Sequence, residues 1–419
     1  MAKIDDSVKK KVPELRFKGF TDPWVQRNLA DLSDGFSYGL NAAAKEYDGV
    51  HGYLRITDID EVSHSFLPEG LTSPDVPENQ LTDYRMDEQS IVYARTGAST
   101  GKTYIYRDSD GELYYAGFLI RQKVNKETSA QFVYQNTLTK AWERYVQVMS
   151  QRSGQPGINA QEVGRFELAI PEKAEQDKIA HLFNSLDNLI AANQRKLTKL
   201  KELKQGYLQK MFPKNGSKFP QLRFAGFADA WEERKFSNLA EVRRGLTYKP
   251  SDVQKYGVRV LRSSNIAEDT FLIKSDDVFV NKEAVKIDKV KNGDILITSA
   301  NGSSRLVGKH ALIEGIENDT VHGGFMLVAR AEKPEFVNAI MSSSWYSKFI
   351  NTFVSGGNGA IGNLSKSDLE DQKVYVPSEI EQTKIGLFFK GLDDTIALHQ
   401  RKLEKLQELK KGYLQKMFC

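Results

Sequence analysis

The chain has 419 residues, of which 40% are hydrophobic and 27% are charged, and its formal net charge is +4. This length is more than one hydrophobic core usually supports, so we expect two globular units with connecting segments. No run of about 18 apolar residues is present to cross a bilayer. The single cysteine, Cys419, excludes an internal disulfide, which fits a reducing cytoplasm.

The chain opens on a polar, lysine-containing segment, residues 1–12, which we predict to be a flexible tail rather than a signal peptide. A strip rich in aromatic residues and glycine follows at 13–24, and a closely similar strip returns at 220–231. A repeat of this kind is the first feature to establish, because it decides the architecture. The strip is expected to dock its Phe and Trp side chains onto a domain or a helix.

Each strip opens a segment of mixed character, at 13–171 and 220–377. Shared landmarks, such as 53–59 with 260–266, show that the two segments are divergent copies. Short apolar runs broken by Gly, Asn and Asp indicate strands, and helical stretches lie between them. We therefore predict an α+β fold class, with two similar domains of mixed α/β structure, each of about 150 residues.

Each domain is followed by a predicted long helix, at 172–212 and 378–419. Apolar residues recur in alternating steps of four and three, which is the seam of a coiled coil. The residues 206–212 and 412–418 are identical. The predicted seam consists of Ile179, Phe183, Leu186, Ile190, Leu197 and Leu200 in the first helix and of Ile385, Phe389, Leu392, Ile396, Leu403 and Leu406 in the second.

The linker between the two halves, residues 213–219, is short. The second domain must therefore begin near the far end of the first helix, and the second helix must run back along the first. This predicts an intramolecular antiparallel coiled coil that separates the domains, with the two halves related as a pseudo-twofold tandem repeat. A parallel coiled coil between two copies of the chain is the alternative.

Two similar but non-identical domains on a rigid spacer suggest a molecular ruler. The grooves of B-DNA repeat about every 34 Å, so a spacer would let two domains contact two half-sites on one face. Since the domains differ most in their loops, the half-sites should differ, which predicts a bipartite, asymmetric target with an unread gap. The alternative is a coiled-coil scaffold whose two domains bind other proteins.

No catalytic motif competes with this interpretation. The stretch 97–103 imitates a phosphate-binding loop, but three residues separate its glycines where that loop needs four, and the second copy has five. A turn that joins two strands and displays a lysine is the better account. The six histidines are scattered, so no metal site is predicted. We find no adenine methyltransferase motif, and we expect no enzymatic activity in this chain.

The candidate DNA contacts lie on the loops. Basic and hydroxyl side chains near the glycine turns are expected to contact phosphates, and amide, basic and aromatic side chains on other loops are expected to read bases. The first group is Arg95, Ser99, Thr100, Lys102, Ser303, Ser304, Arg305 and Lys309; the second is Gln155, Asn159, Tyr248, Lys249, Asn301 and Asn358. For each residue, turn chemistry or a solvated surface is the alternative.

The duplicated layout resembles a known family. The two helices that carry Gln-Arg-Lys-Leu and end on Gly-Tyr-Leu-Gln-Lys-Met-Phe, with the Gly-Ala-Ser-Thr-Gly-Lys loop, resemble the DNA specificity subunit of type I restriction-modification systems. The resemblance implies that the domains are target-recognition domains that bind double-stranded DNA. It also implies two modification subunits, which use S-adenosylmethionine to methylate adenine, and restriction subunits that use ATP and Mg. The chain itself would hold no cofactor and would direct both activities.

Overall fold

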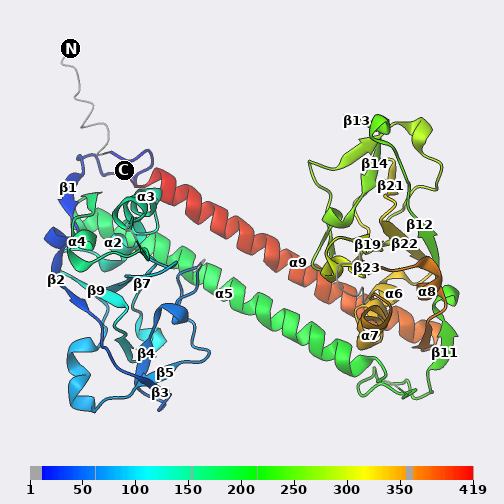
Figure 1. Cartoon of the computed structure of the whole chain (residues 1–419), viewed down its shortest axis with the longest axis horizontal. Coiled ribbons are helices and arrows are strands. Elements are labelled where there is room, and N and C mark those ends of the chain that lie inside the picture. The colour runs from blue at the N-terminus through cyan, green and yellow to red at the C-terminus, as the bar shows by residue number, and fades with distance from the viewer. Residues whose placement is uncertain (1–11, 62, 152–153, 215, 355–361, 419) are drawn as a thin grey trace. The chain divides into compact units, whose positions relative to one another are not determined.

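The computed structural model describes residues 12–61, 63–151, 154–214, 216–354 and 362–418 (Figure 1). The chain divides into two compact units, the first formed by Met1–Ala192 with Leu403–Cys419 and the second by Asn193–Lys402. Residues 1–11 of the predicted tail and Cys419 lie outside the described residues. Each unit contains one globular domain together with parts of both long helices.

The first unit is built around a four-stranded antiparallel sheet in the order β2-β9-β6-β7. All five residues of β6 are buried, as expected for the apolar run 90–94. The strands of this sheet are β2 (Ser33–Tyr38), β6 (Ser90–Ala94), β7 (Thr103–Ile105) and β9 (Leu119–Val124). Two-stranded pairs surround it: β1 (Val25–Asn28) with β10 (Glu167–Ile170), β3 (Ala44–Glu46) with β5 (Thr72–Pro74), and β4 (Gly52–Leu54) with β8 (Leu113–Tyr115).

The second unit repeats this plan. Its antiparallel sheet has the order β12-β22-β18-β20, formed by β12 (Ala240–Arg244), β18 (Ile295–Thr298), β20 (His310–Leu312) and β22 (Met326–Ala331). A second sheet contains β13 (Val253–Gln254), β17 (Val278–Val280), β14 (Val258–Leu261) and β21 (Thr320–His322). The remaining pairs are β11 (Glu232–Lys235) with β24 (Lys373–Val376), β15 (Ile266–Ala267) with β16 (Thr270–Phe271), and β19 (Ala300–Asn301) with β23 (Gly362–Asn363).

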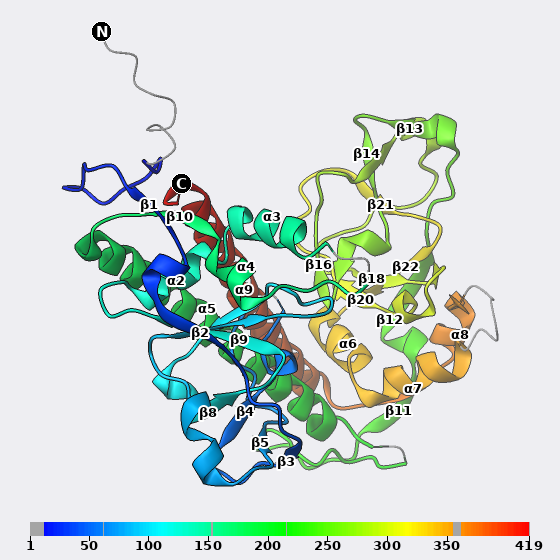
Figure 2. The same cartoon turned by 60° about the vertical axis from the view of Figure 1, so that its left-hand side comes forward.

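Short helices pack against one side of each main sheet. In the first unit, α2 contacts β6 and β7. In the second unit, α6 contacts β20 and β22 (Figure 2). The short helices are α2 (Ala130–Asn136), α3 (Lys140–Met149), α4 (Ala160–Gly164), α6 (Pro334–Met341), α7 (Ser344–Phe353) and α8 (Lys366–Glu370). The mixed α+β character predicted for both domains is confirmed.

The two long helices are α5 (Lys173–Met211) and α9 (Glu379–Lys416). With 39 and 38 residues at about 1.5 Å each, they are both roughly 60 Å long. The seam follows the predicted spacing. Ile179, Phe183, Leu186, Ile190, Leu197, Ile385, Phe389 and Leu403 are buried, while Leu200, Leu392, Ile396 and Leu406 are half-buried.

The helices pair in opposite directions, as predicted. In the first unit, Lys410 Nζ lies 2.7 Å from Asp187 Oδ1. In the second unit, His399 Nδ1 lies 3.3 Å from Asn193 Oδ1, and Lys204 Nζ lies 2.7 Å from Asp393 Oδ1. Residue numbers rise along α5 where they fall along α9, so the coiled coil is antiparallel and forms within one chain.

The repeated strips attach each domain to both helices. In the first unit, Arg16 donates two hydrogen bonds to Glu175 at the start of α5, at 2.9 and 2.7 Å, and the backbone N–H of Leu15 donates to Lys416 O at the end of α9. Trp24 is buried and also donates to Glu175, at 3.2 Å. The expected docking of the strip is therefore confirmed.

The second unit carries the same clamp on the opposite helix ends. Arg223 donates two hydrogen bonds to Glu381 at the start of α9, both at 2.7 Å, and Leu222 N–H donates to Lys210 O near the end of α5. Trp231 is buried as Trp24 is. Both carboxylates are fully buried and both arginines are mostly buried, so each clamp is a bidentate ion pair with little access to water.

Candidate nucleic-acid interface

The glycine turn of the first unit joins β6 to β7, as predicted, but it does not display its lysine. Lys102 is only 6% exposed, and its Nζ donates to Ile59 O at 2.8 Å and to Glu61 Oε1 at 2.6 Å. The hydrogen bond from Lys102 lowers the pKa of Glu61. A phosphate contact would break this pair, so the structure corrects the expectation that Lys102 is available to DNA.

The hydroxyl groups of this turn also serve the fold. Thr100 Oγ1 donates to Gly97 O at 2.7 Å, which closes the turn. Ser99 Oγ donates to Glu61 Oε1 at 3.1 Å, so it supports the same carboxylate as Lys102. These contacts match the alternative interpretation, in which the residues provide turn chemistry.

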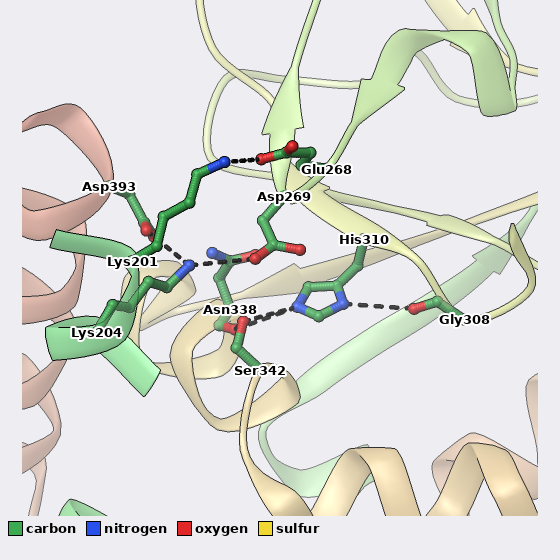
Figure 3. A network of polar contacts seen from close by, with 9 residues as sticks. All are labelled: Lys201, Lys204, Glu268, Asp269, Gly308, His310, Asn338, Ser342 and Asp393. Atoms are coloured by element: carbon green, nitrogen blue, oxygen red, sulfur yellow. Dashed lines mark hydrogen bonds and ion pairs between the residues drawn. The ribbon is translucent and has the colours of Figure 1, made fainter. Parts of the chain in front are cut away.

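The corresponding lysine of the second unit, Lys309, also lies on the side of the long helices. It lines a cavity of about 510 Å³ together with Lys201, Lys204 and residues of the β15–β16 turn. Figure 3 shows the polar network of this region, where Lys204 lies between Asp269 and Asp393. Lys309 is half-buried at this cavity, and its expected contact with a phosphate stays a prediction.

This network joins the second domain to α5. Lys204 Nζ lies 2.7 Å from Asp393 and 3.3 Å from Asp269, and Lys201 Nζ lies 2.7 Å from Glu268. Burial alone lowers the pKa of Lys204, but the two carboxylates outweigh burial and raise it. Burial raises the pKa of Asp393, against the opposing effect of Lys204. The pairs of Lys204 with Asp269 and of Lys201 with Glu268 therefore connect the β15–β16 turn to α5, while Asp393 connects Lys204 to α9.

His310 also lines this cavity. Burial lowers its pKa, and its Nε2 lies 3.2 Å from Ser342 Oγ and 3.3 Å from Asn338 O (Figure 3). Its Nδ1 lies 3.4 Å from Gly308 O, which links the ring to the glycine turn. The His310 side chain thus contacts the end of the loop that carries the candidate residues Ser303, Ser304 and Arg305.

The candidates that remain on the outer loops of the first unit lie close together. Arg95 Cζ lies 4.9 Å from the centre of the exposed Tyr38 ring. The Arg95 carbonyl accepts from Ile158 N at 2.9 Å, which brings the exposed Gln155 and the half-buried Asn159 to the same place. Asn159 Oδ1 accepts from Glu162 N at 2.9 Å and caps α4, so its side chain is already engaged.

In the second unit, the candidates gather on the segment that follows β18. Ser303, Ser304 and Arg305 are exposed there. Asn301 is engaged within the protein, because it donates to Ser263 Oγ at 3.2 Å and accepts from Ser303 N at 2.9 Å. Two candidates precede η7 (Pro250–Asp252), the exposed Lys249 and the half-buried Tyr248, while Asn358 lies outside the described residues.

Sequence reasoning missed two residues at the centre of these loops. Phe118 precedes β9 and is 65% exposed, and Phe325 precedes β22 and is 74% exposed. A glycine packs beneath each turn: a Cβ on Gly39 would lie 2.1 Å from Ala116 O, and one on Gly245 would lie 1.9 Å from Gly323 O. The signal is present in the sequence, because a Gly-Phe dipeptide occurs at 117–118 and again at 324–325.

The second unit carries a pH-sensitive residue, His322, just before the Phe325 turn, and the first unit has a tyrosine at the equivalent position. His322 is buried, its Nε2 donates to Arg243 O at 3.2 Å, and burial lowers its pKa to about 4. Asp294 opposes this shift and Arg243 adds to it. The equivalent residue of the first unit is Tyr115. The backbone carbonyl of Tyr115 accepts a hydrogen bond from Leu40 N, as the backbone carbonyl of His322 accepts one from Leu246 N.

We expect acid to loosen the second unit through His322. Its folded pKa lies below the unfolded value of about 6.5, so its contribution to stability is complete above pH 6.5 and is lost as the pH falls towards 4. The loss should reach about 3 kcal/mol. Hydrogen exchange of the full chain between pH 7 and 4 should show faster opening of β21, and His322→Gln should flatten this dependence. Equal acid sensitivity in the variant would contradict the assignment.

Two features are absent from the part of the chain that the structure describes. No cluster of three or more His, Cys, Asp or Glu side chains there could hold a metal ion. No helix among those residues is long and apolar enough to cross a membrane.

The chain belongs to the family of the type I restriction modification DNA specificity domain, whose model matches it twice, at residues 9–202 and 228–408. The two matches correspond to the two copies of the repeat. Because they cover most of the chain, both domains are DNA specificity domains of this family.

Individual relatives agree with this assignment. The chain is 20% identical over 385 residues to the type I restriction enzyme MjaVIII specificity subunit of Methanocaldococcus jannaschii, covering 88% of this chain and 85% of the relative. It is 27% identical over 195 residues to the EcoKI specificity subunit of Escherichia coli, covering 45% and 41%. The crystal structure of a type I S subunit from M. genitalium has the same fold, with TM-score 0.69, 15% identity and coverage of 97% and 99%.

Proposed function

We propose that the chain reads a bipartite, asymmetric DNA sequence, with one half-site for each unit, and that the α5–α9 coiled coil sets the gap between them. The observation that carries the proposal is the repeat of one fold with different residues at equivalent loops. Arg95 and Gln155 occupy these loops in the first unit, and Ser303, Ser304 and Arg305 occupy them in the second. In this proposal the basic and hydroxyl side chains contact phosphates and amide side chains such as Gln155 read bases, so loops that differ between the units would bind different half-sites.

The proposal assigns catalysis to partner subunits. Two modification subunits, carrying S-adenosylmethionine, would methylate adenine, and restriction subunits, using ATP and Mg, would cleave in the cytoplasm, where the target DNA lies. The long helices support a docking role, because several leucines outside the seam are exposed. These are Leu189, Leu203, Leu387, Leu398 and Leu409. Such apolar side chains on a helix surface favour contact with another protein.

Adenine methylation mapping tests the proposal. We expect that a host without its own adenine methylation, given this chain and its modification subunits, acquires methylation at a single motif with two unlike halves and a fixed gap. Replacing residues 13–171 with the same segment of a relative should change one half only. A continuous motif, or a change in both halves after the replacement, would contradict the proposal. Omission of this chain is the control and should leave the genome unmethylated.

A further inference from the structure

Phe118 and Phe325 form an exposed aromatic pair, one in each unit. Large apolar side chains are usually buried, and both of these are more than half exposed, at 65% and 74%. They occupy equivalent places, because Leu119 pairs with Ala94 in the β6–β9 register and Met326 pairs with Thr298 in the β18–β22 register. Two divergent domains thus expose the same residue type on the same turn.

The backbone holds both turns firmly. In the first unit, Leu119 N donates to Ala116 O at 2.8 Å, and Arg95 N donates to Phe118 O at 3.0 Å. In the second unit, the N–H of Met326 donates to Gly323 O at 2.8 Å, and that of Ser299 donates to Phe325 O at 2.9 Å. A side chain presented on an ordered turn loses little freedom when it binds, so it suits a contact with a partner.

Arginine residues lie on the segments next to each turn. The backbone of Arg95 contacts the Phe118 turn, and Arg244 lies opposite Leu327, two residues after Phe325. Arg305 is exposed on the segment that follows β19. Within the described residues, none of these three guanidinium groups forms an ion pair with a carboxylate. Arginines without carboxylate partners on the segments next to an exposed apolar ring fit a polyanionic partner with apolar groups between its charges, which describes the groove of DNA.

We propose that Phe118 and Phe325 contact base edges in the groove of the bound duplex, one in each half-site, and contribute to sequence discrimination. This inference rests on the proposed function. The major groove presents the thymine methyl group as its apolar feature, so each phenylalanine favours a thymine at one position of its half-site. The neighbouring arginines hold the phosphates and carry no base preference of their own.

The test uses the assembled complex with its modification subunits and a duplex that contains the mapped motif. Phe118→Ala should raise Kd for this duplex roughly tenfold, since loss of a central apolar contact costs about a factor of ten. It should leave Kd for an unrelated duplex and the salt dependence unchanged, because phosphate contacts dominate both. Discrimination against a duplex with one half scrambled should fall for one half only, and Phe325→Ala should affect the other half.

Two matched variants control for structural effects. Val148 is 68% exposed on α3 of the first unit, and Val148→Ala should bind as the unchanged complex does. Phe118→Leu keeps an apolar group and should restore most of the affinity. Unchanged discrimination in both alanine variants would overturn the proposal. So would loss of the modification subunits at unchanged affinity for DNA, which would assign the rings to a protein contact. If the unsubstituted complex methylates no bipartite motif, the proposed function itself fails.

Discussion

Replacing Arg223 by alanine is expected to lower the free energy of unfolding of the second unit by about 3–5 kcal/mol, because it leaves the buried Glu381 carboxylate without its bidentate partner. Arg16→Ala should cost less, since Trp24 still donates to Glu175 at 3.2 Å. Trp231 provides no such bond, because its Nε1 has no partner among the described residues. Denaturant-dependent hydrogen exchange of the full chain measures the free energy of unfolding of each unit separately.

An exposed ion pair provides the matched control. Arg234 and Glu232 lie 2.8 Å apart with side chains 51% and 71% exposed, so Arg234→Ala should change the free energy of unfolding by less than about 1 kcal/mol. Replacing Arg223 by methionine and Glu381 by leucine together should restore much of the loss, because no buried charge is left unpaired. A loss for Arg223→Ala no greater than that for Arg234→Ala would contradict the assignment of the clamp.

Lengthening the coiled coil is expected to lengthen the gap in the recognised sequence. One heptad inserted into each helix beside the Asn193–His399 contact keeps the seam in register and adds about 10 Å. At about 3.4 Å per base pair, the gap should grow by roughly 3 bp. The level of methylation should fall, because 3 bp rotates the groove by about 100°. Both half-site sequences should stay the same. Methylation mapping measures the gap and both halves.

Insertion of a heptad into α5 alone is the control for this experiment. It displaces the seam of α5 against that of α9, and it separates Asn193 from His399. We expect such a chain to lose methylation rather than to acquire a longer gap. An unchanged gap after the paired insertion would show that the helices do not set the spacing.

The features that the sequence predicted well depend on local or repeated patterns. The seam follows from residue spacing alone, so Phe183 and Phe389 are buried as predicted. The strip was recognisable because Trp24 and Trp231 recur in nearly identical surroundings. The antiparallel pairing followed from the short linker, which leaves the second helix no other route within one chain.

The features that the sequence predicted poorly depend on contacts between residues that are distant in the chain. Lys102 turns inward because Glu61, on another segment, provides a carboxylate, and the glycine turn itself gives no sign of this. Phe118 directly precedes the buried apolar residues that begin β9, and its local sequence does not mark it as exposed. Gly39 carries that information, but its close approach to Ala116 becomes visible only in three dimensions.

The division of the chain into units bears on its synthesis. The first unit requires Leu403–Cys419 to complete its core, since Phe418 packs against Phe183 and Trp24. A ribosome releases those residues last, whereas everything in Asn193–Lys402 has emerged before them. Domains ordinarily mature from the N-terminus as translation proceeds. Here the order is inverted: all residues of the second unit are synthesised before the first unit has all of its own, so we expect the first unit to complete its core after the second.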